Sequence, residues 1–146
     1  MHSHRVFLDA SFWIAVRDER EACHAGARQV LLELFRHRSQ FLTTTLVFAE
    51  IHAYFSRSLP KREQVLTDFW ENPLVHFEPV SYADQQAAVM LLRQQRDKSY
   101  SFCDAVSFVI LRRLEVRRVA SLDDHFRQLG EFEVLSGAWP PGAERE

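Results

Sequence analysis

The sequence lacks the features that mark secreted and membrane-spanning proteins. Its two cysteines, Cys23 and Cys103, form no C-x-x-C motif and are too few for a disulfide framework, so we expect reduced thiols. Its strictly apolar stretches, such as Phe12–Val16, are far shorter than a transmembrane helix. The first residues do not lead into a secretory signal segment. These absences together predict a cytoplasmic protein with no membrane span.

Several common catalytic motifs are also absent. The chain has no G-x-x-x-x-G-K-[ST], no G-x-G-x-x-G, no H-E-x-x-H and no G-x-S-x-G motif. A net charge of −2 argues against binding nucleic acid through bulk positive charge. However, 16 of the 18 basic residues are Arg, and local Arg clusters such as Arg112–Arg113 suit phosphate contacts. Compositional bias and solvated helix faces explain these arginines equally well.

The length and the apolar content of the chain suit a single folded domain. It has 146 residues, of which 47% are hydrophobic and 12 are Phe, and it shows no internal repeat or long linker. We therefore expect one domain over residues 1–136 and a flexible tail over residues 137–146, where the sequence reads GAWPPGAERE.

Hydrophobic periodicity predicts strands that alternate with helices. We expect strands at 6–8, 40–43, 74–77, 118–122 and 132–135, and helices at 10–16, 19–37, 46–57, 60–71, 81–96, 102–114 and 124–129. Ser81 and Ser101 are the expected caps of their helices. The segment 46–57 is apolar nearly all round, which predicts a well-buried helix. This order indicates an α/β fold with a mostly parallel sheet and helices on both faces.

Isolated acids are the most informative feature of the sequence. Three acids are each the only charged residue in an apolar run: Asp9 in 6–16, Glu50 in 41–55 and Asp104 in 99–111. Asp123 and Asp124 follow the apolar run 119–122. Carboxylates are almost never fully buried without a partner, and these runs contain no Lys or Arg. Gathering the acids around a hard divalent cation would satisfy them, and the carboxyl ends of parallel strands are where ligands bind in such sheets.

Each of these residues also has a structural interpretation. Asp9, Asp123 and Asp124 could cap helices, and Asp104 could interact with the helix dipole. Glu50 is the hardest to explain in this way. Ser11 could orient a carboxylate, whereas ordinary capping fits Thr43–Thr45 better, and a structural role fits His125 better. Cys103 suits an inert thiol, and the core is expected to contain Trp13, Phe48, Phe55, Phe102 and Phe108.

The chain resembles a PIN-domain ribonuclease, specifically the small toxin of a VapBC-type toxin–antitoxin pair. Four pieces carry the resemblance along the chain: VFLDAS, TTTLVFAEI, SFCDAVSF and VASLDDHF. The resemblance implies a three-layer α/β/α fold, Mg²⁺- or Mn²⁺-dependent endonucleolytic cleavage of RNA, a partner antitoxin and cytoplasmic homodimers. By position, the catalytic and metal-binding acids are Asp9, Glu50, Asp104 and Asp123, with Ser11 and Asp124 in support. The fourth acid is either Asp123 or Asp124, and the arrangement D-D-H-F favours Asp123.

Metal-assisted hydrolysis is the mechanism that these acids suggest, because a bound cation lowers the pKa of water and stabilises charge on a phosphate. Mutual repulsion should raise the pKa values of the clustered acids when metal is absent. Two alternatives remain. The domain could be a catalytically silent binding module that acts through a protein partner. It could also be a phosphohydrolase of small phosphoesters, although L-D-A-S has Ser11 where the haloacid dehalogenase loop needs a second Asp.

Overall fold

The computed structural model describes residues 4–136 and contains a five-stranded parallel sheet in the order β3-β2-β1-β4-β5. The expected fold class is therefore confirmed. Each strand lies within a few residues of its predicted position, because short apolar runs bounded by polar residues mark buried strands well. The strands are β1 (Arg5–Leu8), β2 (Gln40–Thr43), β3 (Val75–Phe77), β4 (Arg118–Ala120) and β5 (Glu133–Leu135).

The helices also follow the predicted order, with differences at their ends. The predicted helix 19–37 begins only at His24, after turns, and the predicted helix 60–71 is α-helical to Val65 and continues as a π-helical segment. The helical elements are α1 (Ala10–Arg17), α2 (His24–Arg36), α3 (Thr45–Phe55), α4 (Leu59–Val65), η2 (Leu66–Trp70), α5 (Tyr82–Gln94), α6 (Phe102–Leu114) and α7 (His125–Gln128).

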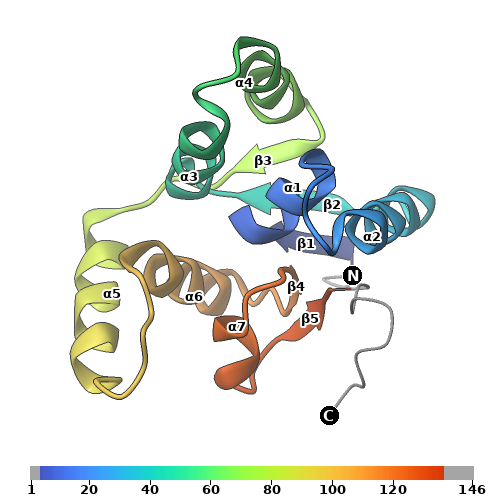
Figure 1. Cartoon of the computed structure of the whole chain (residues 1–146). Coiled ribbons are helices and arrows are strands. Elements are labelled where there is room, and N and C mark those ends of the chain that lie inside the picture. Colours follow the sequence, from blue (N-terminus) through green and yellow to red (C-terminus); the bar gives the residue numbers. More distant parts are fainter. Residues whose placement is uncertain (1–3, 137–146) are drawn as a thin grey trace.

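The order of the strands assigns the helices to two faces of the sheet. The chain moves outward from β1 to β3 and then reverses, crossing to β4 and β5 on the other side of β1. Crossovers between parallel strands are right-handed, so this reversal places α1–α4 on one face and α5–α7 on the other. The contacts agree, because α1 packs against α2 and α3, and α5 packs against α6. Figure 1 shows the strands in the middle of the molecule, with α5 and α6 side by side on one flank.

The reversal also creates a switch point beside β1. The connection after β1 leads to one face of the sheet, whereas the connection into β4 comes from the other face. In open α/β sheets, ligands bind in the crevice beyond the carboxyl ends of the strands at such a point. Asp9 directly follows β1, and Ser121 directly follows β4. The fold therefore brings these two distant segments to one edge of the sheet.

Five aromatic residues were expected in the core, and three of them are buried there. Trp13, Phe55 and Phe108 are buried, whereas Phe48 is only partly buried and packs against the core. The prediction that Phe102 belongs to the core is wrong, because its side chain is exposed at the first turn of α6. The apolar pattern could not reveal this, because the first turn of a helix can project beyond the layer that it covers.

Helix α3 is less buried than its composition suggested. Only Val47, Ile51 and Phe55 are buried, and the face that carries Glu50 and Tyr54 is exposed. The prediction that this apolar segment forms a well-buried helix is therefore wrong. The exposed face lies beside the carboxyl edge of the sheet, where a functional surface is expected.

Two further expectations concern the ends of the chain and the membrane. The predicted tail at 137–146 lies outside the described residues. Among residues 4–136, no helix has the length and apolar character needed to cross a membrane.

Candidate metal centre

Asp9 is the buried centre of the candidate site. It directly follows β1 at the N-terminus of α1, but its side chain caps no backbone N–H of that helix. Instead, its Oδ2 accepts hydrogen bonds from the hydroxyls of Ser11, at 2.7 Å, and Ser121, at 2.8 Å. The side chain is therefore held by hydroxyls from both sides of the switch point, rather than used as a helix cap.

Ser11 and Ser121 also connect Asp9 to the loop after β4. Ser11 Oγ accepts a hydrogen bond from the backbone N–H of Leu122, and Ser121 Oγ accepts one from that of Asp123, each at 3.0 Å. The supporting position predicted for Ser11 agrees with this geometry. Ser121 was missed, although it precedes Asp123 by two residues just as Ser11 follows Asp9 by two, and that spacing was the available signal.

Asp104 serves α6 and the site at the same time. It forms a capping box with Ser101, in which each side chain accepts a hydrogen bond from the other residue's backbone N–H at 3.0 Å. The same oxygen, Asp104 Oδ2, lies 2.6 Å from Nδ1 of His125. Asp104 therefore lies in the first turn of α6, where the dipole interpretation placed it, and its other oxygen makes no hydrogen bond with the described residues.

His125 and Asp123 complete a close group with Asp104. Asp123 Oδ1 accepts a hydrogen bond from the backbone N–H of His125 and lies 3.2 Å from its Nδ1. Ligand atoms of Asp104, Asp123 and His125 all lie within 4.8 Å of one another. The structural role that the sequence suggested for His125 stays a prediction, and the structure places its imidazole in contact with Asp104 and Asp123. Nothing in its local sequence revealed a contact with Asp104, 21 residues earlier.

The structure distinguishes between the two adjacent acids. The Asp123 side chain is part of the group with His125, whereas the Asp124 side chain is 77% exposed and pairs with Arg127 at 3.6 Å. Asp124 is thus not brought into the site, and Asp123 is the better candidate for the fourth acid. Thr44 caps α3 through its hydroxyl, as expected for that position.

Glu50 approaches the group from α3 and is exposed. Partial burial raises the pKa of Glu50, and the charges of Asp9, Asp104 and Asp123 raise it further. The thiol of Cys103 lies beside Glu50 and opposes this shift of its pKa. Burial raises the pKa of Cys103 itself, which agrees with the predicted inert thiol. Glu50 therefore acts electrostatically with the other three acids although it is less enclosed.

Burial, rather than repulsion, is the main electrostatic effect at the site. Burial raises the pKa of Asp9, the two serine hydroxyls oppose that shift, and the charges of Asp104 and Asp123 contribute less. The expectation that pKa values would rise is correct for Asp9 and Glu50, but the principal cause is desolvation. The ion pairs found among residues 4–136 include no Lys or Arg partner for any of the four acids.

One oxygen of each enclosed carboxylate remains without a hydrogen bond. Asp9 and Asp104 use only Oδ2, and Asp123 uses only Oδ1, in the hydrogen bonds formed among the described residues. Hydrogen bonds to one oxygen fix the orientation of a carboxylate and leave the other available as a ligand. Oxygen donors from acids suit Mg²⁺ or Mn²⁺. Among the described residues, the group that could hold a cation is Asp104, Asp123 and His125, and Asp9 and Glu50 interact electrostatically with its two carboxylates.

Comparisons with known proteins agree with this geometry. The model of the PIN domain family matches residues 6–131. Among curated proteins, the 23S rRNA-specific endonuclease VapC20 of Mycobacterium tuberculosis, from strains CDC 1551 / Oshkosh and ATCC 25618 / H37Rv, is 25% identical over 130 residues. The alignment covers 88% of this chain and 97% of that protein.

A solved structure shows the same fold. The crystal structure of Mycobacterium tuberculosis VapC20, described as a Sarcin-Ricin loop cleaving toxin, superimposes with a TM-score of 0.77 at 23% identity. It covers 88% of this chain and 98% of its own. The family match extends from β1 to the segment before β5, and so includes every element that contributes an acid to the site. This chain belongs to the PIN domain family.

Proposed function

We propose that this protein is a metal-dependent endoribonuclease that acts as the toxin of a toxin–antitoxin pair. The observation that carries the proposal is the convergence of Asp9, Asp104 and Asp123 from three separate segments, each with one oxygen fixed and one left without a hydrogen bond. Asp9 supports the proposal most directly, because it is a buried carboxylate that caps no helix and has no Lys, Arg or His partner among residues 4–136, and a bound cation would compensate its charge.

The residues of the chain would prepare the site for phosphodiester hydrolysis. Asp9, Glu50, Asp104 and Asp123 would hold Mg²⁺ or Mn²⁺, which supplies an activated water and stabilises charge on the scissile phosphate. Ser11 and Ser121 keep Asp9 oriented. Hydrolysis that leaves a 5′-phosphate and a 3′-hydroxyl is the outcome that the family resemblance implies.

Ribosomal RNA is the first substrate to test. The matched VapC20 protein is named for cleavage of 23S rRNA, and its alignment with this chain covers 97% of its length. We infer a related RNA target for this chain, and a structured ribosomal fragment is therefore a better first probe than a short homopolymer.

The decisive experiment is RNA cleavage by purified protein in the presence of Mg²⁺, Mn²⁺ or EDTA, with wild type, Asp9→Asn and Asp104→Asn in parallel. We expect cleavage that needs metal and is lost in both variants. Cleavage that persists in both variants would refute this site. No cleavage of ribosomal or total RNA by well-folded wild type at any metal concentration would favour the alternative, a catalytically silent binding module.

The same proposal includes protein partners. A toxin of this type is paired with an antitoxin, and we infer both a neutralising partner protein and a homodimer. Light scattering of the purified protein tests the dimer, and restored growth on co-expression with the product of an adjacent small gene tests the antitoxin. A monomer would contradict the dimer without affecting the catalytic proposal.

A further inference from the structure

A second polar feature lies where the end of α3 meets the start of α4. Here a hollow of about 640 Å³ is lined by cationic and aromatic side chains and by one serine, with no acid in the lining. The lining residues are Arg20, Tyr54, Phe55, Arg57, Ser58 and Lys61. Cations together with aromatic rings suit single-stranded nucleic acid, because phosphates bind the cations and bases stack on the rings.

Two cations of this hollow have no ion-pair partner among residues 4–136. In the part of the chain that the structure describes, Arg57 and Lys61 have no carboxylate within salt-bridge distance, whereas Arg17, Arg112 and Arg113 are each paired with an acid. The Lys61 ammonium lies 5.6 Å from the centre of the Phe55 ring, which places it against the wall of the hollow. Positive charge here is therefore available to an anion from outside.

A third cation is held in a fixed orientation. Nε and Nη2 of Arg20 bond the two carboxylate oxygens of the buried Asp18, at 3.1 and 3.0 Å. The Arg20 side chain is nevertheless 83% exposed, so its remaining N–H groups face solvent. A guanidinium that is already immobilised loses less conformational entropy when it binds a phosphate.

Tyr54 supplies an exposed ring at the same place. Its hydroxyl donates a hydrogen bond to Asp18 at 2.6 Å, which raises the pKa of Tyr54 to about 12 and keeps the ring neutral. Glu21, an exposed acid, also lies 3.3 Å from this hydroxyl. The ring packs edge-on against Phe55, with ring centres 4.9 Å apart, and its outer surface remains exposed. A base can stack on such a surface whatever its identity.

The hollow is close to the acidic site. Tyr54 is four residues after Glu50, so both lie on the same exposed face of α3, about 6 Å apart along its axis. That separation corresponds to about two stacked nucleotides of one strand, at about 3.4 Å each. A strand whose scissile phosphate lies at the acids would therefore reach the hollow within a few nucleotides.

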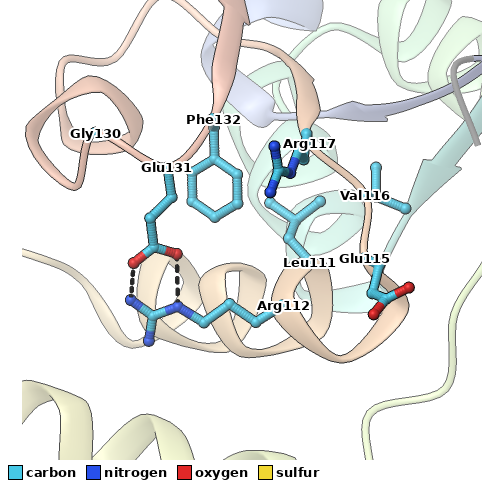
Figure 2. Close-up of a pocket in the computed structure, with 8 residues that line it drawn as sticks. All are labelled: Leu111, Arg112, Glu115, Val116, Arg117, Gly130, Glu131 and Phe132. Atoms are coloured by element: carbon cyan, nitrogen blue, oxygen red, sulfur yellow. Dashed lines mark hydrogen bonds and ion pairs between the residues drawn. The ribbon is translucent and has the colours of Figure 1, made fainter.

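Another hollow serves as a contrast. It lies between the end of α6 and the start of β5, and its lining includes Arg112 and Arg117 but also Glu115 and Glu131. Figure 2 shows Arg112 joined to Glu131 by two hydrogen bonds, of 2.8 and 2.5 Å. Arg20 is paired with Asp18 in the same way, but the Arg112 side chain is only 45% exposed, against 83% for Arg20, and two acids line this second hollow. This hollow also lies at the start of β5, at the edge of the sheet opposite Asp9. The α3–α4 hollow is the better anion site.

We propose that the α3–α4 hollow binds the phosphate backbone of the RNA substrate, next to the scissile bond. Arg57 and Lys61 contact phosphates, Arg20 presents a fixed guanidinium, and the Tyr54 ring stacks with a base. The inference rests on the proposed ribonuclease function, since it names the contacts that hold the same substrate.

The test is binding of a short fluorescent single-stranded RNA in EDTA, where no metal-dependent cleavage can occur. Fluorescence anisotropy would be measured at several salt concentrations for wild type, Arg57→Ala, Lys61→Ala and the double variant. The matched control is Arg36→Ala, an exposed arginine at the end of α2, near the opposite edge of the sheet. We expect the double variant to raise Kd about tenfold. Each single variant should make the slope of the logarithm of the association constant against the logarithm of the salt concentration less negative by about 0.7. Arg36→Ala should change neither quantity.

The outcomes separate this proposal from the ribonuclease proposal. Suppose that wild type cleaves RNA and that the double variant binds RNA as tightly as wild type, with the same salt dependence. The hollow is then not a phosphate site, and the ribonuclease proposal is unaffected. If wild type does not cleave but binding still depends on Arg57 and Lys61, the hollow binds RNA and the catalytic proposal fails. Binding of a polyglutamate peptide is measured with the same variants. If loss of Arg57 and Lys61 weakens binding of that peptide but not of RNA, an acidic protein segment occupies the hollow and the RNA proposal is wrong.

Discussion

His125 Nδ1 lies 2.6 Å from Asp104 Oδ2, and this contact joins the start of α6 to the start of α7. A carboxylate oxygen accepts hydrogen bonds, so Nδ1 is assigned as the donor. The same nitrogen also lies 3.2 Å from Asp123 Oδ1. One imidazole thus fixes two of the candidate ligand carboxylates.

His125→Ala should weaken Mn²⁺ binding by about 10- to 100-fold, because the group that orients Asp104 and Asp123 is lost. Titration calorimetry with Mn²⁺ would measure the change. His37→Ala, an exposed histidine at the end of α2, is the matched control and should bind Mn²⁺ like wild type. Unchanged Mn²⁺ affinity in a folded His125→Ala protein would show that the imidazole does not orient the site.

Asp9→Asn should stabilise the metal-free protein at neutral pH. Burial raises the pKa of Asp9, so the stability associated with its protonated form is fully present below about pH 4 and is lost as the pH rises through the folded pKa. Asn carries no charge to bury, so we expect Tm in EDTA to rise by about 3 °C or more at pH 7 and by less at pH 4.

Mn²⁺ should reverse the order of these two proteins. A ligand that binds only the folded state stabilises it by about 2.7 kcal/mol at about 100 times Kd, so millimolar Mn²⁺ should raise the Tm of wild type. The variant should gain much less. Thermal unfolding followed by circular dichroism measures both effects, and equal Mn²⁺ shifts in the two proteins would argue against Asp9 as a ligand.

Ser121→Ala should reduce kcat/KM for RNA cleavage by about tenfold, because Asp9 loses one of the two hydroxyls that orient it. Ser39→Ala is the control, since Ser39 is also buried but its hydroxyl has no partner among residues 4–136. Initial rates at saturating Mn²⁺ would be compared. An unchanged kcat/KM in a folded Ser121→Ala protein would show that this hydroxyl does not orient Asp9 for cleavage.

Two equivalent capping boxes provide a matched pair of variants. Asp104 in α6 and Asp84 in α5 occupy the same position of the same motif, but Asp84 pairs with Arg113 at 3.0 Å. Either residue replaced by Ala should lower the free energy of unfolding by about 1 kcal/mol or more, from loss of the cap. Only Asp104→Ala should also abolish cleavage. Urea unfolding and a cleavage assay on both proteins measure this, and equal loss of cleavage would indicate a stability effect alone.

Much of the fold could be predicted because its determinants are local. The helix at Phe102–Leu114 was predicted to the residue, since Ser101 and Asp104 form a capping box that is visible in the sequence. The start of α2 was misplaced because the turns over 19–23 are rich in helix-forming residues and carry no distinctive stop signal. Burial of α3 was overestimated because composition alone does not show which face meets the sheet.

The candidate acids could be identified from the sequence, but the residues that hold them in place could not. Asp9, Glu50 and Asp104 were visible because each is a lone charge in an apolar run. Ser121 and His125 were not, because their roles depend on contacts with Asp9, 112 residues away, and with Asp104, 21 residues away. Sequence spacing carries no information about pairs so far apart unless the topology is already known.

The bond between Ser121 and Asp9 has a consequence for the protein during its synthesis. The two residues are separated by 112 positions, and Asp123 follows Ser121 only two residues later. A growing chain on the ribosome therefore lacks both the hydroxyl that holds Asp9 and one of the acids until nearly the whole domain has emerged. Under the proposed ribonuclease function, the catalytic site would be complete only once β4 joins the sheet, so nascent chains would be inert beside the translating ribosome.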